Sequence, residues 1–119
     1  MTEQANNVNS LLLEAMNAYA EQSCFQIKQG TKYQGVTYQN FQTLTLRLAR
    51  FLTGQDLTVG DRVALAAENS LEWMATYVAC LMSGATVVPL HMSSSSDRLH
   101  FVLQDTGARI AVLQDAKAL

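Results

Sequence analysis

The sequence predicts an α/β fold, in which a mostly parallel sheet of βαβ units is flanked by helices. Three short apolar segments with strand character, residues 63–67, 86–90 and 109–113, alternate with two helical stretches. Each helical stretch ends at a glycine, Gly84 or Gly107, as helices commonly do. Because whole helices separate the strands, short hairpins cannot join them, and right-handed crossovers between parallel strands are expected.

A helix and a hairpin are predicted upstream of this unit. Apolar side chains recur at helical spacing across residues 8–19, whereas residues 1–7 are polar and amide-rich and are expected to be disordered. Residues 24–28 and 33–38 have strand character, and they flank a turn at 29–32 that contains a glycine. We therefore expect an antiparallel strand pair between the first helix and the next.

A second helix is predicted to follow the hairpin directly. Thr37 is its expected N-cap, and the helix runs to Thr53, where Gly54 stops it. Its apolar residues fall on one face, as in a helix that covers a core. They are Phe41, Leu44, Leu48, Phe51 and Leu52.

A capping pattern and an apolar stripe predict the third helix. Asn69 can accept a backbone N–H while Glu72, three residues on, reaches back, so the helix is expected to begin near Ser70. It ends at Ser83–Gly84. Its stripe comprises Leu71, Met74, Val78, Leu81 and Met82, of which we expect Met74, Val78 and Leu81 to pack on the strands.

The strands on either side of this helix are expected to be buried. The residues that carry this prediction are Val63, Leu65, Val87, Val88, Ile110 and Val112. Pro89 cannot donate a hydrogen bond to a sheet ladder, so it should lie at a strand end or on an edge strand. A shorter helix, capped by Ser95 or Ser96 and stopped at Thr106–Gly107, leads to the last strand.

Composition limits the classes of protein to which the chain can belong. Its 119 residues suit one α/β domain, 8–119, after the polar N-terminus. Apolar residues make up 49% and charged residues only 15%, against about one quarter charged in most domains. Some apolar surface should therefore be exposed, as in a piece that packs against further chain or in a homodimer. The net charge of −2 and the scattered cations argue against nucleic acid as a partner.

Cysteine usage and the N-terminus indicate a cytoplasmic setting. Cys24 and Cys80 lie on apolar segments without His neighbours in metal-ligand spacing, so buried reduced thiols are favoured over a disulfide or a zinc site. Residues 1–10 lack the cationic start and apolar core of a secretory signal. No apolar run approaches the roughly twenty residues needed to span a bilayer, so no transmembrane segment is predicted.

Four groups of residues could carry chemistry, and each has a simpler structural interpretation. Asn69–Ser70 lies where a strand passes into a helix, a place where open parallel sheets bind ligands, but a helix cap explains it without one. His91 follows the next strand, yet no carboxylate lies near it in sequence. The Ser93–Ser96 loop lacks the glycines and lysine of a phosphate loop. Trp73 and Tyr77, one helical turn apart, favour packing over ligand binding.

The order of these segments resembles the N-terminal region of adenylate-forming enzymes: acyl-CoA synthetases, luciferases and the adenylation domains of peptide synthetases. The resemblance lies in GDRVAL at 60–65, ENS-EW at 68–73, SGATVVPL at 83–90 and DRL-FVLQDTGARIAVL at 97–113. It covers roughly residues 34–113, and its specificity comes from the order and spacing of the segments together. It implies that the fold is the N-terminal subdomain of an acyl-CoA synthetase-like enzyme.

The residues that the family uses for chemistry have no counterpart here. The family carries a Ser/Thr/Gly-rich loop leading into Pro-Lys-Gly, an aromatic-Thr-Glu segment, a ribose-binding aspartate and a C-terminal lysine. We therefore predict no catalytic, cofactor-binding or metal-binding residue in the chain, and we interpret it as an N-terminal fragment whose partner is the rest of the ligase. The resemblance implies ATP, Mg²⁺ and coenzyme A for the parent enzyme.

The leading hypothesis is a long-chain fatty acid–CoA ligase, with this segment as a non-catalytic structural subdomain. His91 after VPL resembles the fatty-acyl branch, because amino-acid adenylation domains typically place Asp there. Asp97-Arg98-Leu99, in contrast, is also common in the amino-acid branch, so that alternative stays open. Two further alternatives are a free-standing α/β interaction module without catalysis and a small dinucleotide-binding domain. The absence of a Gly-x-Gly-x-x-Gly fingerprint argues against the latter.

Overall fold

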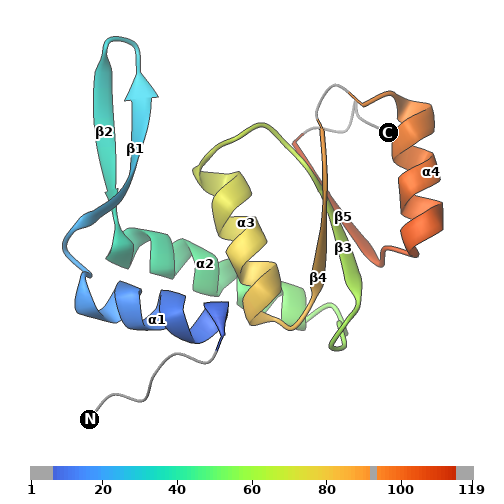
Figure 1. Cartoon of the computed structure of the whole chain (residues 1–119), viewed down its shortest axis with the longest axis horizontal. Coiled ribbons are helices and arrows are strands. Elements are labelled where there is room, and N and C mark those ends of the chain that lie inside the picture. The colour runs from blue at the N-terminus through green and yellow to red at the C-terminus, as the bar shows by residue number, and fades with distance from the viewer. Residues whose placement is uncertain (1–6, 92–93, 115–119) are drawn as a thin grey trace.

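The computed structural model describes residues 7–91 and 94–114. In chain order the elements of this part are α1 (Val8–Ala18), β1 (Ser23–Gln29), β2 (Lys32–Thr37), α2 (Tyr38–Thr53), β3 (Arg62–Ala66), α3 (Leu71–Met82), β4 (Thr86–Leu90), α4 (Ser96–Thr106) and β5 (Ile110–Leu113). Figure 1 shows the hairpin and the helices α1 and α2 on one side of α3, and the β3–β5 sheet on its other side. None of the described helices is both long enough and apolar enough to cross a membrane.

The central sheet has the strand order β4-β3-β5, and both pairings are parallel. Val63 of β3 pairs with Val87 of β4 on one side and with Ile110 of β5 on the other. Helix α3 connects β3 to β4 and helix α4 connects β4 to β5, and the two helices lie on opposite faces of the sheet (Figure 1). The predicted α/β fold with a parallel sheet flanked by helices is therefore confirmed.

The hairpin forms a sheet of its own. Strand β1 pairs antiparallel with β2, and the register closes at Gln29 and Lys32 around a two-residue turn. Gly30, in this turn, has a φ of +64°, a left-handed conformation that glycine adopts without the Cβ clash of other residues. The hairpin predicted between the first two helices is confirmed, and it projects away from α1 and α2 (Figure 1).

Side-chain caps begin the helices, as hydroxyl and amide oxygens replace the missing carbonyl partners of the first turn. Thr37 accepts a hydrogen bond from the Asn40 backbone N–H at 3.1 Å, and Ser95 accepts one from that of Arg98 at 3.2 Å. Both predicted caps are confirmed. The Ser83–Gly84 and Thr106–Gly107 ends are also confirmed, because Gly84 and Gly107 both have left-handed φ angles.

Two caps differ from expectation. Ser70, not Asn69, caps α3: its hydroxyl accepts the Trp73 N–H at 3.0 Å, because Ser70 holds the extended backbone of a cap and the helix begins at Leu71. Asn7, expected in a disordered N-terminus, instead caps α1 by accepting the Ser10 N–H at 2.9 Å. Residues 1–6 lie outside the described residues.

Helix α3 is buried on two sides, and this corrects the predicted packing. Its small residues Ala79 and Cys80 lie in one cluster with Val63 of the sheet. On its other side, Val78 packs with Met16 of α1 and Phe41 of α2, and Met74 joins that cluster. We expected Met74 and Val78 to pack on the strands; instead, small side chains let α3 approach the sheet while larger ones fill the space toward α1 and α2. Leu81, expected on the strands too, is half-buried and belongs to neither cluster.

Burial of the strands follows their place in the sheet. Val63 and Leu65 of the central strand β3 are buried, as predicted. The valines and isoleucine predicted to be buried in the flanking strands are only half-buried: Val87, Val88, Ile110 and Val112. The reason is that β4 and β5 each pair on one side only within the described residues. Pro89 lies on β4, so its predicted place on an edge strand is confirmed.

Thr45 gives a prediction about stability. It is fully buried on α2, and its hydroxyl has no hydrogen-bond partner among the described residues. An isosteric Thr45→Val change removes the desolvation penalty of that hydroxyl, so we expect the free energy of unfolding to rise by about 1 kcal/mol in urea denaturation. Thr43→Val is the matched control in the same helix, because the exposed Thr43 hydroxyl donates to the Gln39 carbonyl at 3.0 Å. A loss of stability in Thr45→Val would show that this hydroxyl is satisfied in solution.

Candidate functional site at the carboxyl edge of the sheet

Three hollows open beside the turn that joins β3 to α3. The hairpin groove, about 590 Å³, lies between β1 and the first turn of α3. The β5 hollow, about 410 Å³, lies between the ends of β3 and β5, and the β4 hollow, about 400 Å³, between the ends of β3 and β4. Open parallel sheets bind ligands outside the carboxyl ends of their strands, so this edge is the candidate site.

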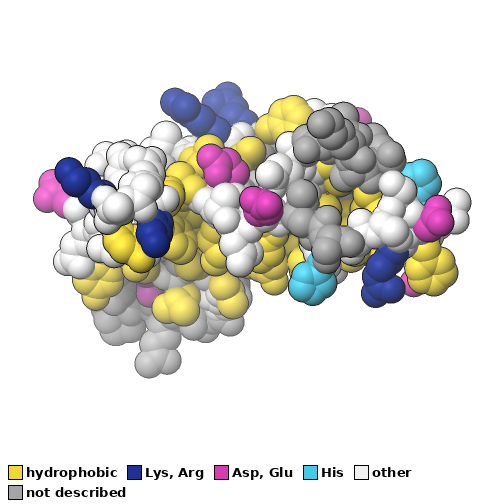
Figure 2. All heavy atoms as spheres, turned by 90° about the horizontal axis from the view of Figure 1, so that it is seen from above, with side chains coloured by type: hydrophobic (Ala, Val, Ile, Leu, Met, Phe, Trp, Pro, Cys, Tyr) yellow, Lys and Arg dark blue, Asp and Glu magenta, His cyan; other side chains and the backbone are white. Residues whose placement is uncertain are grey.

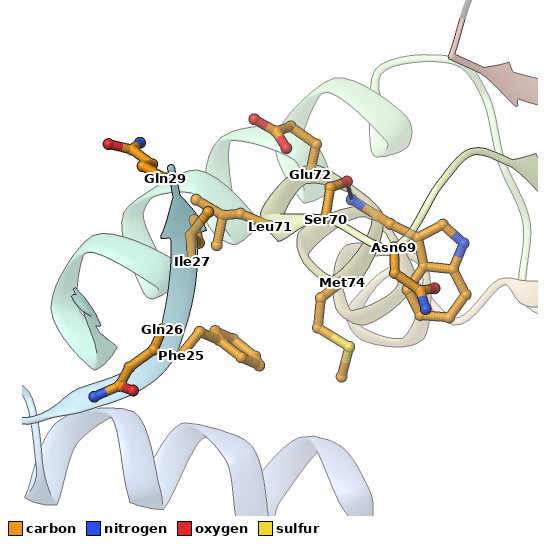
Figure 3. A pocket seen from close by; sticks show the side chains of 10 residues that line it. Phe25, Gln26, Ile27, Gln29, Asn69, Ser70, Leu71, Glu72 and Met74 are labelled. Carbon is orange, nitrogen blue, oxygen red and sulfur yellow. Dashed lines mark hydrogen bonds between the residues drawn. The ribbon is translucent and has the colours of Figure 1, made fainter. Parts of the chain in front are cut away.

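The hairpin groove is apolar inside and polar at its rim. Figure 3 shows Phe25 and Ile27 of β1 directed toward Leu71 and Met74 of α3, while the amides of Gln26 and Gln29 point away. The lining residues include the carboxylate of Glu72 but no lysine or arginine. Figure 2 views this end of the molecule and shows exposed hydrophobic side chains with acidic side chains beside them.

Asn69 and Trp73 each line all three hollows. The indole of Trp73 stacks on the ring of Tyr77, with ring centroids 5.3 Å apart and an angle of 30° between the planes. Both aromatic side chains are half-buried. The structure therefore gives the predicted pair a packing role and, at the same time, places Trp73 where a ligand at this edge would meet it.

Gln114 is a residue of this edge that sequence reasoning missed. Its side-chain oxygen Oε1 accepts a hydrogen bond from the backbone N–H of Glu68 at 2.8 Å, and both residues line the β5 hollow. The available signal was its position, since Gln114 directly follows the last strand just as His91 follows the strand before it.

His91 lies at the edge, as its position after a strand predicted. It lines the β4 hollow together with Glu68, and its carbonyl accepts a hydrogen bond from the Ser94 backbone N–H at 3.1 Å. Ser94 and Ser95 thus serve a turn and a helix cap, in line with the structural interpretation of the serine loop. Ser93 lies outside the described residues.

The thiols of this chain are poor nucleophiles. Burial raises the pKa of Cys80 to about 11, and partial burial also raises the pKa of Cys24. Both thiols are free and neutral at physiological pH. The predicted burial is confirmed for Cys80, whereas Cys24, on the strand β1, is only half-buried. Within residues 7–91 and 94–114, no group of three His, Cys, Asp or Glu side chains is placed to hold a metal ion. The absence of catalytic, cofactor-binding and metal-binding residues stays a prediction.

Asp61, a carboxylate with a lowered pKa, lies at the opposite edge of the sheet. The Thr58 backbone N–H donates a hydrogen bond to the Asp61 carboxylate at 2.8 Å, and this bond is the main reason that the pKa of Asp61 lies below its usual range. The positive charges of Arg109 and Arg62 lower the pKa further. Asp61 also forms an ion pair with Arg109 at 3.6 Å. Asp61 directly precedes β3, Arg62 is the first residue of that strand, and Arg109 directly precedes β5. We therefore interpret these contacts as structural, since they join the amino ends of the two strands.

Comparison with known proteins places the chain among relatives of two kinds. The family model for the AMP-binding enzyme matches residues 13–119. The long-chain fatty acid–CoA ligase FadD13 of Mycobacterium tuberculosis is 31% identical over 77 residues, which cover 65% of this chain and 15% of that protein. Surfactin synthase subunit 1 of Bacillus subtilis is 33% identical over 82 residues, 69% of this chain and 2% of that protein.

A solved structure supports the same placement. The N-terminal subdomain of Klebsiella oxytoca NpsA superposes with a TM-score of 0.80 and 26% identity, covering 92% of this chain and 28% of that one. The chain thus spans about 15% of the length of a curated fatty acid ligase that it matches and about a quarter of this solved relative.

Proposed function

The chain belongs to the AMP-binding enzyme family, and on that premise we propose that it is the N-terminal part of an ATP-dependent acyl-CoA synthetase of the long-chain fatty acid type. In the proposed reaction of the whole enzyme, a carboxylic acid attacks the α-phosphorus of ATP and pyrophosphate leaves. In the second step the thiol of coenzyme A, losing its proton, attacks the acyl carbonyl of the acyl-adenylate; a thioester forms and AMP leaves. The family match over residues 13–119 is the observation that carries this proposal.

The fatty-acyl type is favoured by two features. The mouse long-chain fatty acid–CoA ligase ACSBG1 is similar over 118 residues, which cover 99% of this chain, although at 23% identity. His91 stands after the VPL of β4, where amino-acid adenylation domains typically carry Asp. The similarity to surfactin synthase over 69% of the chain favours the second candidate, an amino-acid adenylation domain.

The contribution of this segment is a scaffold at the edge where the strands end. The described residues offer no metal cluster, and the sequence contains no Ser/Thr/Gly-rich loop leading into Pro-Lys-Gly. The residues present therefore do not fit ATP and Mg²⁺ by themselves. Other segments of the proposed enzyme would hold the nucleotide and coenzyme A.

The shape of the described chain supports packing against further protein. Its radius of gyration is 15.6 Å, whereas a compact domain of this size has about 13 Å. Large apolar side chains are exposed on several elements, as the composition predicted: Val8, Leu11, Leu13, Tyr19, Tyr33, Leu46, Phe51, Val59 and Phe101. The partner that we propose is the rest of the ligase; a homodimer of the chain is the alternative, which sedimentation equilibrium over a hundredfold concentration range would reveal.

Pyrophosphate exchange tests the proposed function. We expect the 119-residue chain to show no acid-dependent exchange between pyrophosphate and ATP. The full-length product of its source gene should show exchange with long-chain fatty acids and none with amino acids. Exchange with amino acids only would favour the second candidate. A gene that encodes no Ser/Thr/Gly-rich loop ending in Pro-Lys-Gly, and a product inactive with both classes, would favour a non-catalytic interaction module.

A further inference from the structure

We propose that Gln114 is a positioning residue, which clamps the β3–α3 turn in the shape that lines the hollows at the carboxyl edge. The side-chain oxygen of Gln114 accepts the Glu68 backbone N–H at 2.8 Å, across 46 positions of sequence. The effect of this clamp on ligand binding rests on the function proposed above.

The clamp continues the pairing of β3 and β5 beyond the ends of the strands. Residue pairing between the two strands ends at Ala66 and Leu113. The backbone N–H of Gln114 then donates to the Ala66 carbonyl at 3.1 Å, and its side chain reaches on to Glu68. Gln114 therefore binds the chain at Ala66 and again at Glu68, where the chain leaves the end of β3.

The held segment is the one that shapes the site. Glu68 lines both the β5 and the β4 hollow, and Asn69, the next residue, lines all three hollows. Ser70 caps α3 immediately afterwards, which fixes the far end of the turn. Among the described residues, the bond from Gln114 is the one hydrogen bond that ties residues 67–69 to another part of the sheet. Without it, the turn would be fixed at its two ends only.

A Gln114→Met change removes the acceptor at nearly constant side-chain size. We expect hydrogen exchange at the Glu68 amide, followed by NMR, to become about tenfold faster, as a lost hydrogen bond of this kind predicts. Trp73, the one tryptophan of the chain, lines the same hollows and should show faster depolarisation of its fluorescence. Gln104→Met, at an exposed glutamine near the C-terminal end of α4, is the matched control and should change neither signal. Unchanged Glu68 exchange in Gln114→Met would overturn the clamp.

The ligand role is tested in the full-length protein by pyrophosphate exchange. Gln114→Met should raise the KM for the acid about three- to tenfold, since about one hydrogen bond of ordering is lost, and leave kcat within about twofold. Gln114→Glu keeps an acceptor oxygen and should restore the KM. A lower melting temperature with an unchanged KM would overturn the ligand role and leave a structural one. A wild-type protein inactive with every acid would overturn the proposed function and the ligand role together, while Glu68 exchange would still decide whether the clamp exists.

Discussion

Replacing Val78 by Asp is expected to unfold the chain. Val78 is 1% exposed and belongs to a hydrophobic cluster with Met16 of α1 and Phe41 of α2, whose described members include no lysine or arginine. A carboxylate there loses its hydration and finds no cation, which costs more than about 4 kcal/mol, a large part of the roughly 5–15 kcal/mol that stabilises a domain. Far-UV circular dichroism should show no cooperative melting transition.

Val59→Asp is the matched control for this experiment. Val59 is 88% exposed in the loop before β3, so the same change should alter the melting temperature by only a few degrees. If Val78→Asp melts like the wild type, α3 does not present this side to α1 and α2 in solution. If both variants unfold, the loss of stability comes from the added negative charge and not from the burial of Val78.

Leu65→Ala is expected to have the second largest effect. Leu65 is 1% exposed on β3, the strand that pairs on both sides. Truncation removes buried apolar side-chain atoms and leaves a cavity beside the central strand. The free energy of unfolding should therefore fall by about 2–5 kcal/mol in urea denaturation. The slope of the transition should stay unchanged if the variant still folds to the same structure.

Leu11→Ala provides the comparison for a leucine outside the core. Leu11 is 58% exposed on α1, and its truncation should change the free energy of unfolding by less than about 0.5 kcal/mol. Equal losses in the two variants would mean that the α1 surface is covered in solution, as self-association through α1 would produce. Both measurements should then be repeated at two protein concentrations. Losses that depend on concentration indicate self-association, whereas losses that do not would mean that Leu11 is buried within the single chain.

The candidate site could be predicted in part. Asn69–Ser70 joins β3 to α3, and His91 directly follows β4. Both were therefore predictable at the carboxyl edge, because strand direction follows from the βαβ order alone. Gln114 obeys the same rule but was missed, since a glutamine after a short strand carries no motif. The hairpin groove was not foreseen, because the distance between β1 and α3 depends on how α1 and α2 pack.

The sequence by itself determined the kind and order of the elements. Helix ends at Thr37, Ser95, Gly84 and Gly107 were predictable because caps and left-handed glycines depend on residues three or four positions apart. The parallel sheet followed for a similar reason, since helices between strands leave no other connection. The order of these segments also sufficed for the resemblance to adenylate-forming enzymes, which the family match over residues 13–119 confirms.

Only the tertiary structure decided which side of each element meets which neighbour. Helix α3 is apolar on two sides, so its periodicity could not say that Ala79 faces the sheet while Val78 faces α1 and α2. The strand order β4-β3-β5 leaves Val87 of β4 and Ile110 of β5 half-buried, although these two strands are as apolar in sequence as β3. The bond between Gln114 and Glu68 joins residues far apart in the chain, and such contacts exist only once the sheet has brought the ends of β3 and β5 together.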